Sequence, residues 1–186
     1  IIQSTSSSIS IVDILELDYK SLDIKPTVIW ASPPCTSFSI AACSSHWRLI
    51  NGMYVPISEG AMLGMQLINK TLEIIEYFKP KYWYIENPRG LLRKMPVMKK
   101  YERTTVWYCT YGDMRAKPTD VWSNNLYSLF KTNGWASRPQ CYNGNTHCHH
   151  EPAPRGSKTG TQGLKNNHER SKIPTALCNE IILSTI

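Results

Sequence analysis

Two short apolar segments, each followed at once by a turn that carries a reactive side chain, constrain the fold of this chain most. Residues 28–31 run into a Pro-Pro-Cys turn that ends at Cys35, and residues 82–85 run into a Glu-Asn-Pro turn that begins at Glu86. Between them, apolar residues recur at spacings of three and four from 61 to 78, which predicts an amphipathic helix. Strand, helix and strand predict a right-handed βαβ unit with parallel strands. We therefore expect Cys35 and Glu86 in one crevice, at the carboxyl ends of neighbouring strands.

Weaker patterns outline the rest of the chain. Ser58 suits the start of the predicted helix and Lys79-Pro80 its end. Segments 11–17 and 104–109 are predicted strands, 120–123 an antiparallel partner of the latter, 173–183 a final helix, and 40–57 a long mobile loop. We expect an α/β core over residues 1–133, an irregular lobe over 134–168, and a C-terminal helix over 169–186 that returns to the core.

Composition narrows the class of protein. The 186 residues are enough for one good core, and no apolar stretch approaches a membrane span. Because the N-terminus lacks the features of a signal peptide, we expect a cytoplasmic protein with no membrane partner. The net charge of +7 and the pI near 9.1 fit a polyanionic partner, although a charge that serves only solubility is the alternative. The six cysteines are expected as thiols, a nucleophile or metal ligands rather than disulfides.

Cys35 and Glu86 are the candidate reactive groups. A thiolate adds readily to an electron-poor carbon once nearby positive charge or helix amides lower its pKa. A carboxyl kept protonated by a partly desolvated crevice could donate a hydrogen bond to a ring nitrogen. The alternatives are that Cys35 is a small buried hydrophobe, and that Glu86 is a cap or an ion-pair partner of Arg89 or Arg93. Together the two motifs favour a site.

These motifs resemble those of the cytosine carbon-5 DNA methyltransferases. Residues 32–39 look like the family's catalytic Pro-Cys loop, and residues 86–88 resemble its Glu-Asn-Val motif. Tyr111-Gly112, followed by Arg115 and Lys117, is similar to its Tyr-Gly and basic cluster, and residues 170–174 stand where its closing helix would be. The compact spacing looks most like the short enzymes of phages and prophages, some of which serve restriction–modification. The resemblance implies a Rossmann-like class I methyltransferase sheet, mostly parallel, with a small irregular DNA-recognition lobe.

The resemblance also implies a reaction and a set of site residues. The enzyme would transfer a methyl group from S-adenosyl-L-methionine to carbon 5 of a cytosine flipped out of double-stranded DNA, through a covalent cysteine adduct. The implied catalytic residues are Cys35, Glu86 and Arg115. The implied cofactor-binding residues are Asp13, Ile14, Pro33, Leu63, Ser171 and Ile173. The expected DNA-binding residues are Ser37, Ser39, Arg48, Arg89, Lys117, Arg155, Lys158, Thr161 and Gln162.

Some of the family's features are missing. No glycine precedes Gly52, so the Phe-x-Gly-x-Gly cofactor loop is absent, and Thr119 stands where the family usually has an arginine. We therefore expect a second chain, or a missing N-terminal segment, to complete the cofactor pocket. One alternative is a catalytically incompetent DNA-binding remnant or subunit of such an enzyme. Another is a zinc-organised interaction module in which Cys35 is structural.

A cluster of soft ligands follows in the irregular lobe. Cys141 is followed by Cys148 and His149, and Cys109 could supply a fourth ligand from across the fold, as a structural zinc ion requires. The spacing matches no standard zinc motif, so a chance cluster in a polar loop is the alternative.

Overall fold

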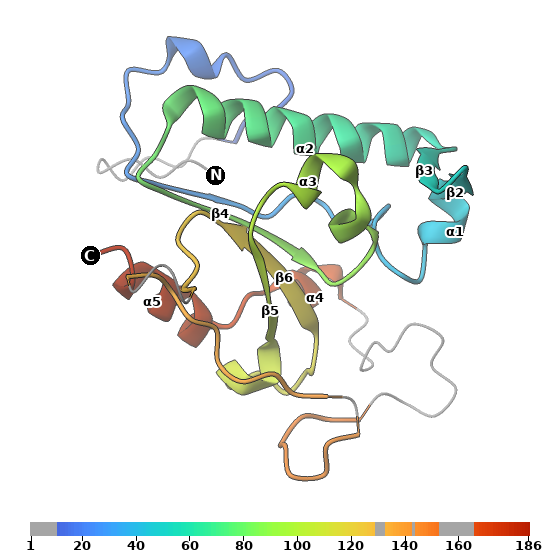
Figure 1. Cartoon of the computed structure of the whole chain (residues 1–186), viewed down its shortest axis with the longest axis vertical. Helices are drawn as coiled ribbons and strands as arrows, with labels where there is room; N and C mark the ends of the chain where they lie inside the picture. The colour runs from blue at the N-terminus through green and yellow to red at the C-terminus, as the bar shows by residue number, and fades with distance from the viewer. Residues whose placement is uncertain (1–10, 129–132, 143, 153–165) are drawn as a thin grey trace.

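The computed structural model describes residues 11–128, 133–142, 144–152 and 166–186 (Figure 1). One long helix accompanies elements that are otherwise short. The strands are β1 (Val28–Ala31), β2 (Trp47–Ile50), β3 (Met53–Pro56), β4 (Tyr82–Pro88), β5 (Arg103–Trp107) and β6 (Pro118–Ser123). The helices are α1 (Cys43–His46), α2 (Glu59–Phe78), α3 (Pro96–Lys99), α4 (Asn167–Ser171) and α5 (Thr175–Leu183), with 3₁₀ turns η1 (Tyr19–Ser21), η2 (Leu91–Lys94) and η3 (Tyr108–Tyr111). None of the helices in the described ranges is both long and apolar enough to cross a membrane.

The main sheet has the strand order β1-β4-β6-β5. β1 and β4 are parallel, with Ala31 opposite Ile85, so the predicted βαβ unit is present. β6 pairs antiparallel with both β4 and β5, as the sequence predicted for β5 and β6. The predicted mostly parallel sheet is not confirmed, because in the described sheet only the β1–β4 pair runs parallel. What is confirmed is a mixed α/β fold.

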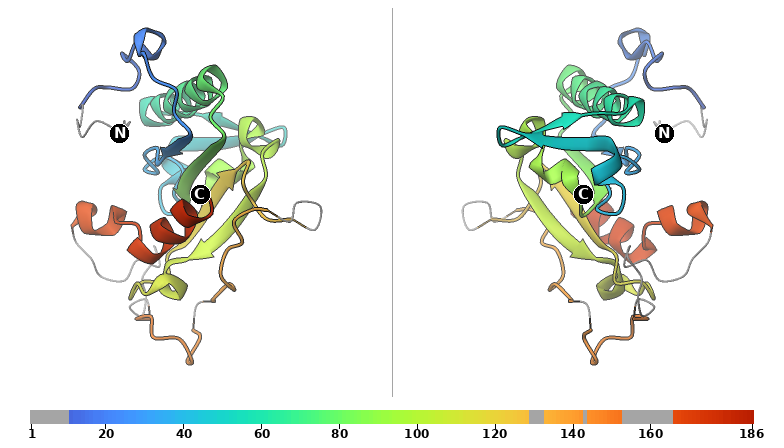
Figure 2. Two further views of the ribbon diagram at one scale, coloured as in Figure 1. Left: turned by 90° about the vertical axis from the view of Figure 1, so that its left-hand side faces the viewer. Right: turned by 90° about the vertical axis from the view of Figure 1, so that its right-hand side faces the viewer.

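Helices cover the two faces of the sheet. Ser58 caps α2 by accepting from the Ala61 amide at 3.1 Å, and Lys79 ends it in the left-handed conformation, as predicted. The apolar stripe of α2 packs on Trp83 and Ile85 of β4. On the opposite face, α5 packs against Tyr84 and the neighbouring strands (Figures 1 and 2). Because side chains alternate along β4, Glu86 lies on the α5 side.

Two sequence-based expectations are wrong. Residues 11–17 form no strand; a turn replaces it, in which the Asp13 carboxylate accepts from the Leu15 amide at 3.0 Å. Residues 40–57 are not one long loop but contain α1 and the antiparallel β2–β3 hairpin. The hairpin is held down by Trp47, which is buried, stacks on Phe38 and donates to the Ser37 carbonyl at 2.9 Å. The division into core, lobe and C-terminal helix stays a prediction.

Candidate active site

Cys35 lies in the loop that follows β1. The Phe38 and Ser39 amides donate to the Cys35 carbonyl at 3.0 and 2.9 Å, so the chain turns sharply just after the cysteine. The residue is partly exposed, with a free thiol. The Pro-Pro dipeptide before it restricts the backbone and cannot continue the sheet. The turn therefore holds the thiol beyond the carboxyl end of β1.

The Cys35 loop is joined directly to β4 and the turn that follows it. The side-chain amide of Asn87, which is fully buried, donates to the Pro33 carbonyl at 2.8 Å. The Leu91 amide donates to the Phe38 carbonyl at 2.7 Å. At Gly90 the approach is so close that an added Cβ would lie 2.3 Å from the Phe38 carbonyl oxygen. The two motifs recognised in the sequence thus form one packed unit.

Glu86 is a buried carboxyl on the central strand β4. Burial raises its pKa above the ordinary value, while the Lys117 ammonium and hydrogen bonds from Tyr108 and Ser32 act in the opposite direction. The Tyr108 hydroxyl donates to Oε1 at 2.9 Å. The suggested ion pair with Arg93 is not formed, because Arg93 binds Asp120 instead. Glu86 is thus a carboxyl whose protonated form is favoured.

The same charges act on the Cys35 thiol. Burial raises its pKa, the Lys117 ammonium lowers it, and the Glu86 carboxylate raises it. Burial in turn lowers the pKa of Lys117, which the Glu86 carboxylate opposes. Cys35, Glu86 and Lys117 therefore share one electrostatic environment. Protonation of Glu86 removes a like charge near the sulfur and so favours the Cys35 thiolate.

Arg115 is fully engaged within the protein. Its guanidinium binds the Asp113 carboxylate and donates to the carbonyls of Glu169 and Arg170, both at 3.0 Å. Lys117 also donates to the Arg170 carbonyl, at 2.9 Å. The predicted catalytic Arg115 thus ties the end of α4 to the loop before β6. Of the two basic residues, Lys117 is the one that acts on both reactive groups.

The residues predicted to bind the cofactor are spread over the fold. Asp13 and Ile14 lie in the N-terminal turn, and Leu63 is half exposed on α2. Ser171 ends α4, and Ile173 packs on the cluster beneath α5. Neither of two surface hollows, one beside Tyr54 and Lys94 and one beside Tyr19 and Tyr77, is lined by any of the six predicted residues. Among the described residues, these six enclose no pocket, so their role in binding the cofactor stays a prediction.

The predicted DNA-binding residues differ in exposure. Arg48 is exposed on β2, and Arg89 is exposed, with its guanidinium 5.5 Å from the Trp107 ring centroid. Ser39 is partly exposed. Ser37 is buried against Gly64 and Phe38, away from solvent. Arg155, Lys158, Thr161 and Gln162 lie outside the described residues.

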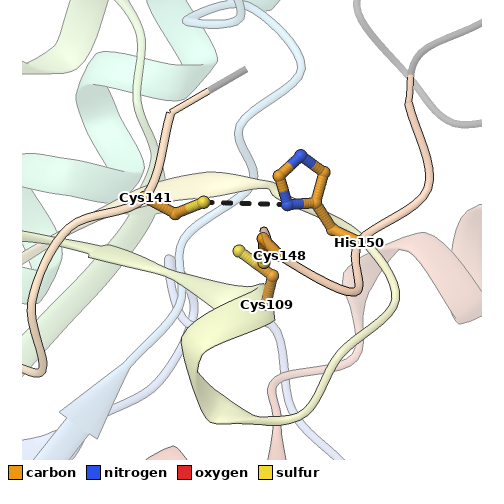
Figure 3. Close-up of side chains that lie close together, drawn as sticks. All are labelled: Cys109, Cys141, Cys148 and His150. Carbon is orange, nitrogen blue, oxygen red and sulfur yellow. Dashed lines mark hydrogen bonds between the residues drawn. The ribbon is translucent and has the colours of Figure 1, made fainter. Parts of the chain in front are cut away.

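The soft ligands do come together, with one correction. Cys109, Cys141 and Cys148 gather around His150, and the four ligand atoms lie within 4.8 Å of one another (Figure 3). His149 is exposed and is not part of the group, so the choice of His149 over its neighbour was wrong. Cys35 is not part of the group either.

Sequence reasoning missed two further residues of the site. Tyr108, the donor to Glu86, ends a predicted strand, and no local pattern pairs it with a residue 22 positions earlier. Asn87 was noted only as part of a motif, and its bond to Pro33 crosses 54 positions. Such contacts follow from how β1, β4 and β6 are placed side by side, which no short motif encodes.

Comparison with known proteins adds an independent finding. A family model described as C-5 cytosine-specific DNA methylase matches residues 3–104, more than half of the chain. A protein of Frog virus 3 (isolate Goorha), described as a probable DNA (cytosine-5)-methyltransferase, is 35% identical over 119 residues. That alignment covers 61% of this chain and 54% of the viral protein. The chain thus matches about half the length of this curated relative.

Proposed function

Since the chain belongs to the C-5 cytosine-specific DNA methylase family, we propose that it carries the half of the active site that binds and activates the cytosine for methylation at carbon 5. Its substrate is double-stranded DNA from which the target base is flipped out. The observation that carries the proposal is the docking of the Cys35 loop on β4, the strand that carries the buried Glu86 carboxyl, with the Lys117 ammonium acting on both groups.

Cys35 is the nucleophile. Its thiolate adds to carbon 6 of the ring, and the electron pair of the 5,6 double bond moves onto carbon 5 and the ring. Lys117 provides the positive charge that favours the thiolate, and neutral Glu86 removes the opposing one. When carbon 5 has been substituted and loses its proton, the thiolate is expelled and the double bond is restored.

Glu86 holds the ring and stabilises the charge that develops. In its protonated form the carboxyl donates to N3, and its other oxygen accepts from the exocyclic amine. The Tyr108 hydroxyl donates to Oε1 and so fixes the orientation of the carboxyl group. Because the carboxyl is buried, this hydrogen bonding acts where water screens it little.

The methyl group is supplied by S-adenosyl-L-methionine, as the family implies. The predicted contacts in this chain are only part of a pocket for it, and no glycine-rich loop precedes Gly52. We propose that a glycine-rich segment, carried by a longer form of the chain or by a second chain, completes the pocket. The same missing loop favours the second candidate function, a DNA-binding remnant or subunit that does not turn over alone.

The addition step can be tested without the methyl donor. Addition of a thiolate to carbon 6 lets carbon 5 take a proton from water, and reversal then releases either hydrogen. In double-stranded DNA that carries deuterium at carbon 5 of cytosine, the chain should therefore replace that deuterium by hydrogen from water. Mass spectrometry of the released nucleosides measures the loss. Cys35→Ser should abolish the exchange, whereas Cys178→Ser, at the nearby thiol on α5, should retain it.

Two outcomes separate the candidate functions. Exchange that depends on Cys35, with no methyl transfer until a glycine-rich segment is added, supports a split or incomplete enzyme. DNA binding with no exchange supports the remnant and contradicts Cys35 as a nucleophile in this chain.

A further inference from the structure

Four soft ligand atoms converge from two stretches of chain far apart in sequence (Figure 3). Cys109 lies in η3, directly after β5, and Cys141, Cys148 and His150 follow β6 in a stretch without helix or strand in its described part. We infer that these four residues bind a structural zinc ion. None of the four residues takes part in the proposed chemical steps, so the inference does not rest on the proposed function.

The geometry is close to that of a zinc site. With Zn–S near 2.3 Å and Zn–N near 2.0 Å, the ligand atoms of a tetrahedron lie about 3.5–3.8 Å apart. The Cys141 Sγ and the His150 Nδ1 are 3.7 Å apart, and no pair in the group exceeds 4.8 Å. Shifts of about 1 Å or less would then close the remaining pairs around an ion. Three cysteines and one histidine are a common donor set for structural zinc.

The surroundings also suit an ion bound by thiolates. Cys109, Cys141 and His150 are buried, and Trp107 and Ala116 pack around the sulfurs. The Asn145 side-chain amide donates to the Cys141 Sγ at 3.4 Å, which would stabilise negative charge on that sulfur. Because all four positions are filled by protein atoms, no place is left for water or substrate, so the role is structural.

A metal would add to the few contacts that hold this stretch, among them the Arg138 guanidinium, which donates to the Thr110 carbonyl at 2.6 Å and pairs with Glu180. The described residues between 136 and 152 contribute no large apolar side chain to the buried core. One backbone bond, from the Glu151 amide to the Met114 carbonyl at 2.8 Å, joins its end to the loop before β6. Small segments without a core are commonly held by a metal or a disulfide. Zinc would fix this stretch to η3 and to that loop.

The location connects the metal to the wall of the Glu86 site. Cys109 directly follows Tyr108, which donates to Glu86, and Met114 directly precedes Arg115. The zinc would therefore hold η3 in place behind the carboxyl. It would also fix the chain just before residues 153–165, which contain the basic residues that the sequence suggests for DNA contact.

Metal content tests the inference directly. The full chain, purified without chelator from zinc-supplemented medium, should contain one zinc per chain by elemental analysis and by native mass spectrometry. His150→Ala and Cys141→Ser should lose the ion. The matched controls His149→Ala and Cys43→Ser, which alter an exposed histidine and a cysteine outside the group, should keep it.

A second measurement does not depend on variants that fold. Replacing zinc by Co²⁺ in the unaltered chain should give the visible absorption of tetrahedral cobalt and the near-ultraviolet band of cobalt–thiolate bonds. A chelator should lower the melting temperature, and Zn²⁺ but not Mg²⁺ should restore it. A metal-free chain, a six-coordinate cobalt spectrum, a disulfide between any two of the three cysteines, or equal loss from His149→Ala would each overturn the inference.

Discussion

Gly90 offers a sharp test of the way the Cys35 loop is docked on β4. Its backbone is extended, with φ of −165°, so an alanine there meets no left-handed strain. The added Cβ would instead lie 2.3 Å from the Phe38 carbonyl oxygen, a backbone atom that cannot move without moving the loop. Gly90→Ala should therefore push the loop away from β4.

The cost can be worked from two parts. Losing the hydrogen bond from the Leu91 amide to the Phe38 carbonyl costs about 1 kcal/mol. Forcing extra volume into a packed contact adds about 1–3 kcal/mol. Gly90→Ala should thus lower the free energy of unfolding by about 2–4 kcal/mol. Gly52→Ala is the matched control: its φ is +78° with open space around it, so it costs only about 1 kcal/mol of backbone strain.

Urea unfolding followed by tryptophan fluorescence measures both variants, and carbon-5 hydrogen exchange of cytosine reports on the site. Gly90→Ala should lose exchange activity under conditions where it is still folded, because the sulfur moves relative to Glu86. The reasoning is refuted if Gly90→Ala is no less stable than Gly52→Ala, or if it retains full exchange.

Three further predictions concern charge. Because burial raises the pKa of Glu86, its ionised form costs stability as pH rises. In urea titrations, Glu86→Gln should therefore have a higher free energy of unfolding than the unaltered chain at about pH 8, and this gain should shrink toward about pH 4. A pH-independent difference would contradict the prediction. Lys117→Met removes the charge that favours the Cys35 thiolate. Iodoacetamide should therefore label Cys35 more slowly at a given pH and need a more alkaline pH for the same rate, as measured by peptide mass spectrometry. An unchanged labelling rate would argue against the coupling. Asp120→Asn leaves two arginines without their buried partner and should lower the free energy of unfolding in urea by about 3 kcal/mol. Glu180→Gln, in a more exposed ion pair, should lower it by less than about 1 kcal/mol. Equal losses would count against the buried network.

The βαβ unit can be predicted from the sequence because each of its parts carries a local signal. The helix has a capping serine, an apolar stripe and a stop at Lys79, and both strands are apolar. The β2–β3 hairpin also carries a signal, the Asn51-Gly52 pair with positive φ at both residues, which the aperiodic residues around it obscure. No local sequence signal sets the direction of β6 beside β4, since that direction depends on contacts between distant segments.

The residues of the site also fall into those with a local sequence signal and those without one. Cys35 and Glu86 can be found because each follows an apolar segment at the point where an α/β sheet binds ligands. The predicted turn at Glu86 is wrong, however, because β4 continues through Glu86 to Pro88. The choice between His149 and His150 cannot be made from spacing, because neighbouring side chains in irregular backbone point in different directions. Tyr108 is hidden for another reason: its partner is fixed only by the alignment of β4 beside β6, and of β6 beside β5.

The placement of β4 between β1 and β6 gives the two halves of the site unequal support from the sheet. Glu86 lies within β4 and pairs with Val121 of β6, one position beyond the last β1–β4 pair, so opening there requires β4 and β6 to separate. The turn with Cys35 follows β1, which is at the edge of the described sheet, and contacts at Pro33 and Phe38 attach it to β4 and the turn after β4. Local opening is therefore expected first at the Cys35 turn, so its contacts with β4 decide how well the sulfur stays aligned with the carboxyl.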